Sequence, residues 1–270
     1  MLIVGLGEAG KNIAKLFKPH TKTYKILTFD EGEGLDAKNN VEGYDEQPIK
    51  ITSRGLKSHS EGLLFVCGSG KVAGATLRLL EALQAHQMTV VYLVPDLEFA
   101  SREERLRHRV HYGVLQEYAR SGKIKEIIIL SNKALLDYVG AGPIRKYYEK
   151  VNYYIYSTFQ NINFCQNVDQ DFGKLHRPKE ISRISTIGWG QIGREEMILF
   201  PLENITESQY YMNIDESDLD SDEDLLPNCQ HIVRENNALE RHSSFAIWKN
   251  SETDNHYYVK HYTHHIQESQ

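Results

Sequence analysis

Two glycine-rich turns are the segments of this sequence best suited to bind a phosphate. Gly5-Leu-Gly7-Glu-Ala-Gly10 stands between an apolar run, Leu2–Val4, and an amphipathic stretch, so it joins a predicted strand to a predicted helix. Glycine allows positive φ angles and close approach of the backbone, and such a turn directs amide N–H groups and a helix N-terminus at an anion. The same pattern also fits a turn that only packs a strand on a helix.

The second turn, Cys67-Gly-Ser-Gly-Lys-Val-Ala-Gly74, again lies between a predicted strand and a predicted helix. Two such turns at successive strand ends predict two loops that hold one polyphosphate, whereas a dinucleotide site uses one. Lys71 is placed to neutralise phosphate charge, although a lone exposed lysine is more often solvated. The spacing is not that of a Walker motif.

An NAD-dependent oxidoreductase is the main alternative. Asp30 ends the second predicted strand about 20 residues after the first turn, where a dinucleotide-binding fold places its ribose-binding acid. The sequence shows no evident catalytic His/Lys or Tyr-x-x-x-Lys arrangement to accompany it. A tight structural turn likewise remains an alternative for each glycine segment.

The elements that must position these turns alternate between strands and helices over the first half of the chain. This order predicts a doubly wound parallel sheet, with right-handed crossovers that place helices on both faces. A short strand is expected at Ile49–Thr52, within a segment that otherwise reads as loop. The other expected strands are Leu2–Val4, Tyr24–Phe29, Gly62–Cys67, Thr89–Val94 and Lys125–Leu130, and the helices are Lys11–Phe17, Gly74–Ala85 and Arg102–Ser121 with Leu106, Val110, Val114 and Tyr118 as its inner stripe.

The second half predicts a long helix followed by a smaller α+β domain. The helix is expected at Ile144–Gln160, Asn161–Pro178 reads as irregular, and the acidic run Asp215–Asp224 reads as a solvated loop. We therefore divide the chain into a nucleotide-binding domain (1–143), a helix and loop (144–178) and a C-terminal domain (179–270). The strands expected in that last domain are Arg183–Ile187, Gln209–Ile214, Ser244–Trp248 and His256–Tyr262, with a helix at Leu225–Glu235.

Composition excludes several classes of protein. The 31 basic and 37 acidic residues give a net charge of −6, and the 25% charged and 40% hydrophobic residues are ordinary globular values. This excludes a disordered chain and argues against binding nucleic acid through bulk positive charge. Three scattered cysteines indicate a reduced, cytoplasmic setting, and no apolar run reaches the ~18 residues of a membrane span. His256, His261, His264 and His265 read as solvated strand residues, so no metal ligand is predicted.

Taken in order, the motifs resemble the tubulin/FtsZ superfamily over nearly the whole chain. Two of them resemble the phosphate loops of that family. The first is Gly5-Leu-Gly-Glu-Ala-Gly-Lys-Asn12. The second, Val66-Cys-Gly-Ser-Gly-Lys-Val-Ala-Gly74, resembles an altered form of the signature Gly-Gly-Gly-Thr-Gly-Thr-Gly. The others resemble the segments that follow in the family: Phe99-Ala-Ser-Arg-Glu-Glu-Arg-Leu, Ile129-Leu-Ser-Asn132, Tyr148-Glu-Lys-Val-Asn152, Asn167-Val-Asp-Gln-Asp171-Phe and Ile184-Ser-Thr-Ile-Gly-Trp.

The resemblance implies GTP or GDP with Mg²⁺ as ligands and a head-to-tail homopolymer as the assembly. It implies that Asp169 and Asp171 orient the attacking water at the nucleotide of the next subunit, so hydrolysis is completed in the filament. A heterologous interface that does not close gives such a filament. The nucleotide contacts it implies are Gly7, Glu8, Ala9, Asn12, Gly68, Ser69, Gly70, Lys71, Asn132, Tyr148 and Asn152.

The resemblance also implies partners and a setting. We expect a compact, phage- or plasmid-type member in the bacterial cytoplasm, acting through an adaptor or a DNA-bound cargo protein, without direct nucleic-acid contact or a membrane span. The second turn has lost the threonines and one glycine of the family loop, so a member without GTPase activity, serving as a structural protein, is an alternative. Either Arg102 or Arg105 could match the phosphate-facing arginine of the family.

Overall fold

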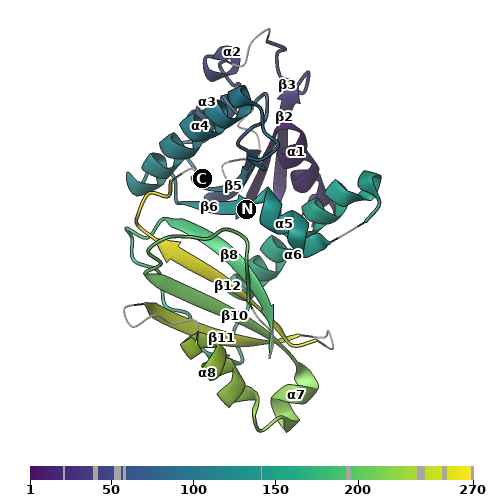
Figure 1. Ribbon diagram of the computed structural model, residues 1–270, viewed down its shortest axis with the longest axis vertical. Helices are drawn as coiled ribbons and strands as arrows, with labels where there is room; N and C mark the ends of the chain where they lie inside the picture. Colours follow the sequence, from purple (N-terminus) through teal and green to yellow (C-terminus); the bar gives the residue numbers. More distant parts are fainter. Residues whose placement is uncertain are drawn as a thin grey trace. The chain divides into compact units, whose positions relative to one another are not determined.

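The computed structural model describes residues 1–20, 22–38, 42–51, 56, 59–140, 142–192, 196–235, 241–250 and 254–268. The chain divides into two compact units, one formed mainly by Met1–Tyr156 and one by Ser157–Gln267. The division falls inside the longest helix, α6 (Ile144–Asn167), so each unit takes part of that helix. Figure 1 shows the elements coloured along the chain.

The first unit is a parallel sheet covered by helices. Its strand order is β3-β2-β1-β4-β5-β6, and every neighbouring pair is parallel. Helix α1 lies on one side of the sheet, and α3 and α4 lie on the other (Figure 1), so the doubly wound prediction is confirmed. The elements are β1 (Leu2–Leu6), α1 (Gly7–Leu16), η1 (Lys18–His20), β2 (Lys25–Glu31), β3 (Gly34–Leu35), α2 (Glu42–Asp45), β4 (Glu61–Cys67), α3 (Ala75–Ala82), β5 (Gln87–Val94), α4 (Arg102–Arg120), β6 (Glu126–Ser131), α5 (Asn132–Val139) and α6.

Burial explains why these strands occupy the centre of a two-sided sheet. All residues of Leu2–Leu6 are buried, as are those of Met88–Val94 and Glu126–Leu130, so side chains on both faces of the sheet are covered. Continuous apolar runs of this kind are typical of parallel strands with helices on both faces. The expected strand at Ile49–Thr52 is wrong for residues 49–51, which are not strand, and Thr52 lies outside the described residues.

Helix α4 begins where the sequence indicated, because Ser101 and Glu104 form a capping box. Ser101 Oγ accepts from the Glu104 amide at 3.2 Å, and Glu104 Oε2 accepts from the Ser101 amide at 2.7 Å. The predicted inner stripe is wrong, since Leu106 and Val110 are 63% and 53% exposed. The buried face carries polar and aromatic residues instead: His108, His111, Tyr112, Leu115, Gln116 and Ala119.

The second unit is a mixed sheet, as expected for an α+β domain. Its strand order is β8-β12-β10-β11-β7; β12 runs antiparallel to β8 and β10, while β10 and β11 are parallel. The elements are β7 (Phe172–Gly173), β8 (Ile184–Gln191), β9 (Met197–Ile198), β10 (Glu207–Asp215), α7 (Glu216–Ser221), α8 (Leu225–Glu235), β11 (His242–Asn250) and β12 (His256–Thr263).

Three expectations for this half are corrected. Residues 161–167 are not irregular, because α6 continues to Asn167. The acidic run is not wholly loop: Asp215 caps the short helix α7, where its carboxylate accepts from the Ser217 amide at 2.9 Å. His256 and His261 are not solvated but 9% and 2% exposed, and His264 and His265 follow β12 instead of lying in it. Nδ1 of His261 lies 2.7 Å from Ser208 Oγ, and its Nε2 lies 3.1 Å from Glu196 Oε1.

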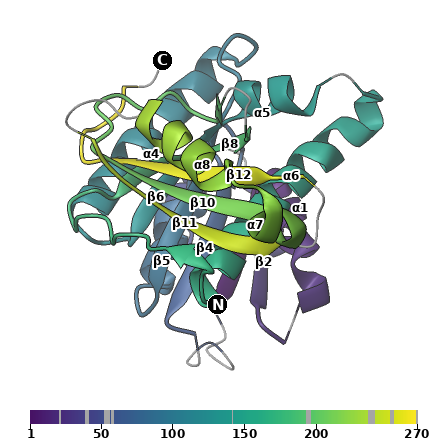
Figure 2. The same cartoon turned by 90° about the horizontal axis from the view of Figure 1, so that it is seen from below.

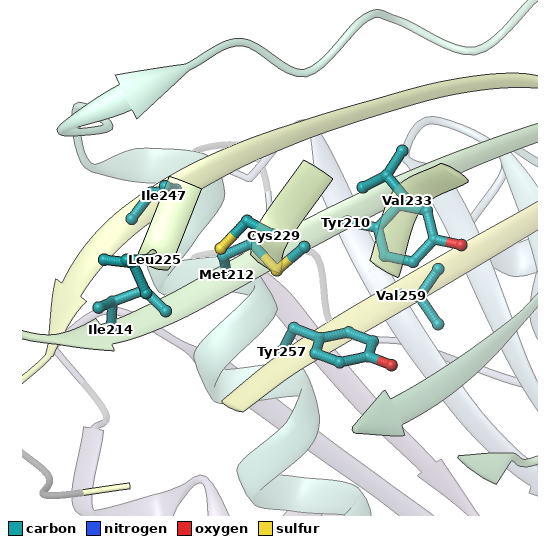
Figure 3. Packing of buried hydrophobic residues seen from close by; sticks show 9 residues of the cluster. All are labelled: Tyr210, Met212, Ile214, Leu225, Cys229, Val233, Ile247, Tyr257 and Val259. Atoms are coloured by element: carbon teal, nitrogen blue, oxygen red, sulfur yellow. The ribbon is translucent and has the colours of Figure 1, made fainter. Parts of the chain in front are cut away.

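Helix α8 supplies one side of the core of the second unit (Figure 3). Leu225, Cys229 and Val233 recur every four residues on its buried face. They pack on side chains of β10, β11 and β12, and Figure 2 shows the helix lying across these strands. Burial raises the pKa of the Cys229 thiol to about 11, so this cysteine is a small apolar core residue. The strand residues of the cluster are Tyr210, Met212, Ile214, Ile247, Tyr257 and Val259.

Across the residues that the structure describes, no helix is both long enough and apolar enough to cross a lipid bilayer.

A buried histidine lies between α4 and β5 in the first unit. His108 is 1% exposed, and its Nδ1 lies 2.9 Å from the hydroxyl of Tyr92. The ring also lies against Tyr112, with centroids 5.1 Å apart. Burial lowers the pKa of His108 from 6.5 to about 4, because the charged ring would lose its hydration.

We expect His108→Gln to reduce the loss of stability in acid. Between pH 6.5 and about 4 the unfolded chain binds a proton on this ring that the folded chain does not, so the free energy of unfolding falls as the pH is lowered through that window. A shift of this size corresponds to roughly 3 kcal/mol. Urea unfolding at neutral and at mildly acid pH measures the fall.

The exposed His265 provides the control, since His265→Gln should lose as much stability in acid as the wild type. Part of the fall persists in His108→Gln because burial also lowers the pKa of His111. An equal acid loss in His108→Gln and in the wild type would contradict the assignment of a neutral buried ring.

Candidate functional site

The two glycine turns lie side by side at one edge of the parallel sheet. Strands β1 and β4 are neighbours, with Leu6 paired to Val66, so both strands end at the same edge. Gly7, the first residue of α1, has φ +71°, and a Cβ on it would lie 3.1 Å from Cγ2 of Val72 in the second turn. The predicted convergence of the two turns is therefore present in the fold.

The glycines of the first turn are required by close packing and by backbone conformation. A Cβ at Gly5 would overlap the carbonyl oxygen of Gly10, and a Cβ at Gly10 would overlap the carbonyl oxygen of Phe65 in β4. Helix α1 can therefore approach the sheet closely only with glycine at these positions. Gly7 is required by its positive φ, which side chains disfavour.

The N-terminus of α1 has the features of an anion site. Leu6 occupies the N-cap position with extended backbone and makes no side-chain cap hydrogen bond, so the first amides of the helix are not satisfied by a capping side chain. Gly7 is buried, Ala9 is half-buried, and Glu8 and Asn12 are exposed. These amides and the positive end of the helix are suited to a negatively charged group.

The second turn is built from short internal hydrogen bonds and one bond to a neighbouring strand. The Gly68 amide donates to the carbonyl of Leu93 in β5 at 3.0 Å. The Gly70 amide donates to Cys67 at 3.2 Å, and the Ala73 amide donates to Gly70 at 3.0 Å. Ser69 and Gly70 are half-buried between these anchors. The turn is thus hydrogen-bonded to β5 at Gly68, and internal backbone hydrogen bonds stabilise its remaining residues.

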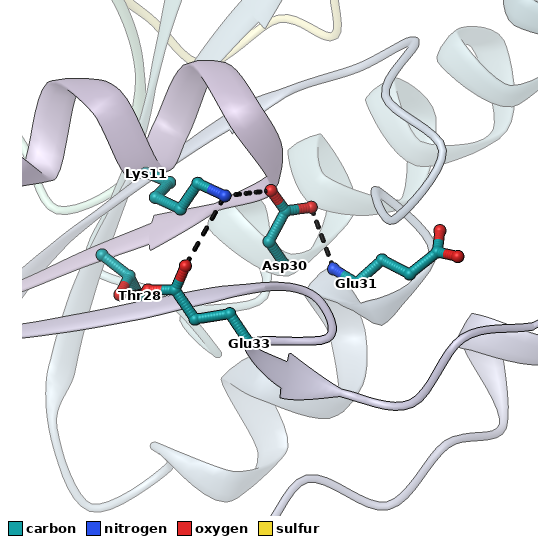
Figure 4. A network of polar contacts seen from close by, with 5 residues as sticks. All are labelled: Lys11, Thr28, Asp30, Glu31 and Glu33. Atoms are coloured by element: carbon teal, nitrogen blue, oxygen red, sulfur yellow. Dashed lines mark hydrogen bonds and ion pairs between the residues drawn. The ribbon is translucent and has the colours of Figure 1, made fainter.

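Both lysines of the turns are paired with carboxylates at the end of β2. Lys11 Nζ lies 2.5 Å from Asp30 Oδ2 and 3.5 Å from Glu33 Oε2 (Figure 4). Lys71 Nζ lies 2.6 Å from Glu31 Oε2; this hydrogen bond lowers the pKa of Glu31 and raises that of Lys71. An entering phosphate must therefore compete with these acids for the two ammonium groups.

The residues expected to contact a base are on α5 and α6. Asn132 is the first residue of α5, directly after β6, so it lies at the same edge of the sheet as the glycine turns; Ser131 Oγ caps this helix by accepting from the Ala134 amide at 3.3 Å. Tyr148 and Asn152 are one turn apart on α6. Tyr148 is 69% exposed and Asn152 is half-buried.

The two expected catalytic acids belong to the second compact unit. Asp169 is exposed in the segment after α6. Asp171 is bound to β11: its amide donates to the carbonyl of Ile247 at 2.8 Å, and its Oδ2 accepts from the Lys249 amide at 2.8 Å. The segment then continues as β7, which pairs with β11. The carboxylate of Asp171 therefore already accepts a backbone hydrogen bond from β11, whereas Asp169 lies exposed before that strand pairing begins.

Arg107, which contacts the second turn, was missed by the sequence analysis. Arg107 donates from a terminal guanidinium nitrogen to the carbonyl of Ser69 at 3.2 Å. Of the two arginines considered earlier, Arg102 is exposed and Arg105 donates from Nε to the carbonyl of Ala100. The helical spacing of Arg107 and His111 is the signal that could have indicated a second polar face of α4.

No protein-family model matches the sequence, and no curated protein matches it. Solved structures match over almost the whole chain. A GTPγS-form protofilament of TubZ from Bacillus thuringiensis serovar israelensis has a TM-score of 0.69 at 14% identity, covering 98% of this chain and 87% of that one. The empty FtsZ dimer of M. jannaschii has 0.70 at 12%, covering 97% and 87%. A four-stranded filament of TubZ-Bt has 0.73 at 14%, covering 97% and 85%.

Identities of this size support the fold and not a function. The similarity covers the parallel sheet with its two glycine turns, the long helix and the second unit with its mixed sheet. This chain has the fold of the tubulin/FtsZ superfamily.

Proposed function

We propose that this protein binds GTP and assembles head to tail into filaments. The proposal is based mainly on the contact between the two glycine turns, since Gly7 lies against Val72 at the edge of the sheet. Solved structures with this fold include GTPγS-form and GDP-form protofilaments and filaments of TubZ. A site made of amides and a helix N-terminus has the chemistry that a polyphosphate requires.

The turns would divide the phosphates between them. The amides of Gly7, Glu8 and Ala9 and the N-terminus of α1 would hold one phosphate, and Asn12 lies one turn further along the helix. Gly68, Ser69 and Gly70 would present further amides. Lys71 would exchange Glu31 for a phosphate oxygen, because both are anions and the ion pair is exposed.

The base would be recognised from α5 and α6. Asn132 and Asn152 carry amide groups that can both donate to and accept from a guanine edge. Tyr148 would stack on the base, and its exposure leaves the ring face open for such contact. The spacing of Tyr148 and Asn152 by one helical turn places both side chains on one face of α6.

Mg²⁺ would accompany the nucleotide. Among the described residues, no three or more His, Cys, Asp or Glu side chains gather to hold a metal ion by themselves. Magnesium bound with a nucleotide needs only one or two protein carboxylates, since phosphate oxygens and water complete its shell. Glu8, exposed in the first turn of α1, is the acid suited to this role. The ion would neutralise phosphate charge.

Hydrolysis would be completed by the next subunit in the filament. Asp169 and Asp171 would orient the attacking water, and Asp169 is the stronger candidate because Asp171 already accepts a backbone hydrogen bond. The filament would act in the cytoplasm and would position a DNA-bound cargo through an adaptor. One matched structure is described as a TubZ of type III plasmid segregation, which is consistent with such a role.

Two other functions have specific support. A structural protein that binds GTP without hydrolysing it is favoured by the altered second turn. An NAD-dependent oxidoreductase is favoured by Asp30, but Lys11 already contacts that carboxylate at 2.5 Å, where a ribose would need it as an acceptor.

We expect GTP and GDP, but not NAD, to raise the melting temperature. A ligand at a hundredfold its Kd stabilises the folded state by about 2.7 kcal/mol, which corresponds to a shift of several degrees. Thermal unfolding with each nucleotide at matched concentration measures the effect. Stabilisation by NAD alone would overturn the proposal in favour of an oxidoreductase.

In the assembled state, Asp169→Ala should leave GTP affinity and filament formation intact and slow phosphate release about 100-fold, since the water would lose its orienting carboxylate. Phosphate release and electron microscopy above the assembly concentration measure the two effects. Asp220→Ala, which removes another exposed carboxylate of the same unit, is the matched control. Equal turnover in both variants would contradict the assignment of Asp169, and filaments without any phosphate release in the wild type would favour the structural protein.

A further inference from the structure

The second glycine turn is enclosed by side chains from three other elements of the first unit. At its start, a Cβ on Gly68 would overlap the hydroxyl of Tyr92 in β5. In the middle, the carbonyl of Ser69 accepts from Arg107 of α4 at 3.2 Å. At its end, a Cβ on Gly74 would overlap Oδ1 of Asp45 in α2. Neighbouring side chains therefore occupy the space that side chains at these glycines would fill.

One pair of residues lies at both ends of this turn. His111 of α4 lies against the backbone of Gly68, and its Nε2 lies 3.8 Å from Oδ1 of Asp45. Since Asp45 lies against Gly74, the two side chains connect the first and the last glycine of the turn. His111 is only 6% exposed, whereas the side chain of Asp45 is 53% exposed. The contact therefore extends from the core to the surface.

The face of α4 that lies under the second turn carries polar groups that destabilise the folded state. Within the described residues, buried Nε of Arg107, Nε2 of His108 and Nδ1 of His111 have no hydrogen-bond partner. Unpartnered buried donors and acceptors are unfavourable, and apolar side chains would fill this space with less loss. Retaining polar groups here is expected where they have a role other than packing.

We propose that Asp45, Arg107 and His111 are positioning residues, which hold the second turn in the conformation that binds the terminal phosphates of the nucleotide. The inference rests on the proposed function, because it assigns a purpose to the phosphate site described there. The turn lacks the threonines of the family signature loop, so fewer of its own hydroxyl groups can fix it. Side chains from α2 and α4 supply that constraint, and amides fixed in advance bind an anion without reorganisation.

This arrangement predicts a loss of affinity that depends on the number of phosphates. The second turn would contact the phosphates, whereas the base would be recognised by residues of α5 and α6. Loosening the turn should therefore weaken GTP more than GDP, and should leave GMP nearly unaffected. A general loss of stability would instead weaken all three nucleotides together.

Asp45→Ala is the sharpest test, because charge and positioning predict opposite results. Removing a carboxylate beside a phosphate site should strengthen anion binding if only charge matters. We expect GTP affinity to fall about tenfold instead, since misplaced amides bind phosphate poorly. The neighbouring exposed Glu46 gives the matched control: Glu46→Ala makes the same charge change and should leave GTP affinity unchanged or slightly stronger. Calorimetric titration with GTP, GDP and GMP measures these affinities.

Arg107 provides an independent measurement. Arg107→Gln should weaken GTP without weakening GMP, and Arg107→Lys should restore part of the affinity because an ammonium can still donate to the carbonyl of Ser69. Equal losses for GTP and GMP, or a rise in GTP affinity in Asp45→Ala as in Glu46→Ala, would overturn the inference while leaving the proposed function intact. A wild-type protein that binds none of the three nucleotides would overturn both.

Discussion

The parallel pairing of β1 with β4 is the constraint on which the candidate site depends. Leu6 and Val66 lie opposite each other, so the chain leaves both strands at the same edge and must turn there twice. Because the two turns abut at Gly7 and Val72, neither can change conformation without affecting the other. The close approach of α1 to β4 at Gly10 fixes the position of the first helix amides relative to the sheet. The proposed phosphate site is therefore a property of the strand order as much as of the loop residues.

Charge alone does not make this edge an anion site. The chain has a net charge of −6, and the lysines of both turns are paired with acids at the end of β2. A phosphate would gain little from ammonium groups that it must first take from carboxylates. Amides and a helix N-terminus carry no such competitor, since their partial charges are fixed in the backbone. Phosphate affinity at the proposed site would then depend mainly on how accurately the amides are held.

The sequence predicted what depends on local pattern and failed where distant contacts decide. The apolar runs at Leu2–Leu6 and in β4, β5 and β6 were sufficient to predict the parallel sheet, because burial on both faces leaves a pattern within each strand. The inner face of α4 was predicted wrongly, since periodicity arguments place leucine and valine inside and do not expect buried histidine or glutamine. The attachment of Asp171 to β11 depends on residues far along the chain, and no local motif encodes it. Of the candidate site, the two turns were found and the side chains behind the second one were not.

A fold shared at 12–14% identity constrains the apolar pattern far more than the residues of its loops. Loop residues can therefore change while the strand ends stay in place. Either its own hydroxyl groups or neighbouring side chains can keep a phosphate loop rigid, and both solutions give the same arrangement of amides. The second turn of this chain has few hydroxyl groups of its own, yet Arg107, His111 and Asp45 contact its middle and both its ends. The absence of threonines from this turn is thus not by itself an argument against the proposed nucleotide binding, because the physical requirement is rigidity and the fold offers a second way to meet it.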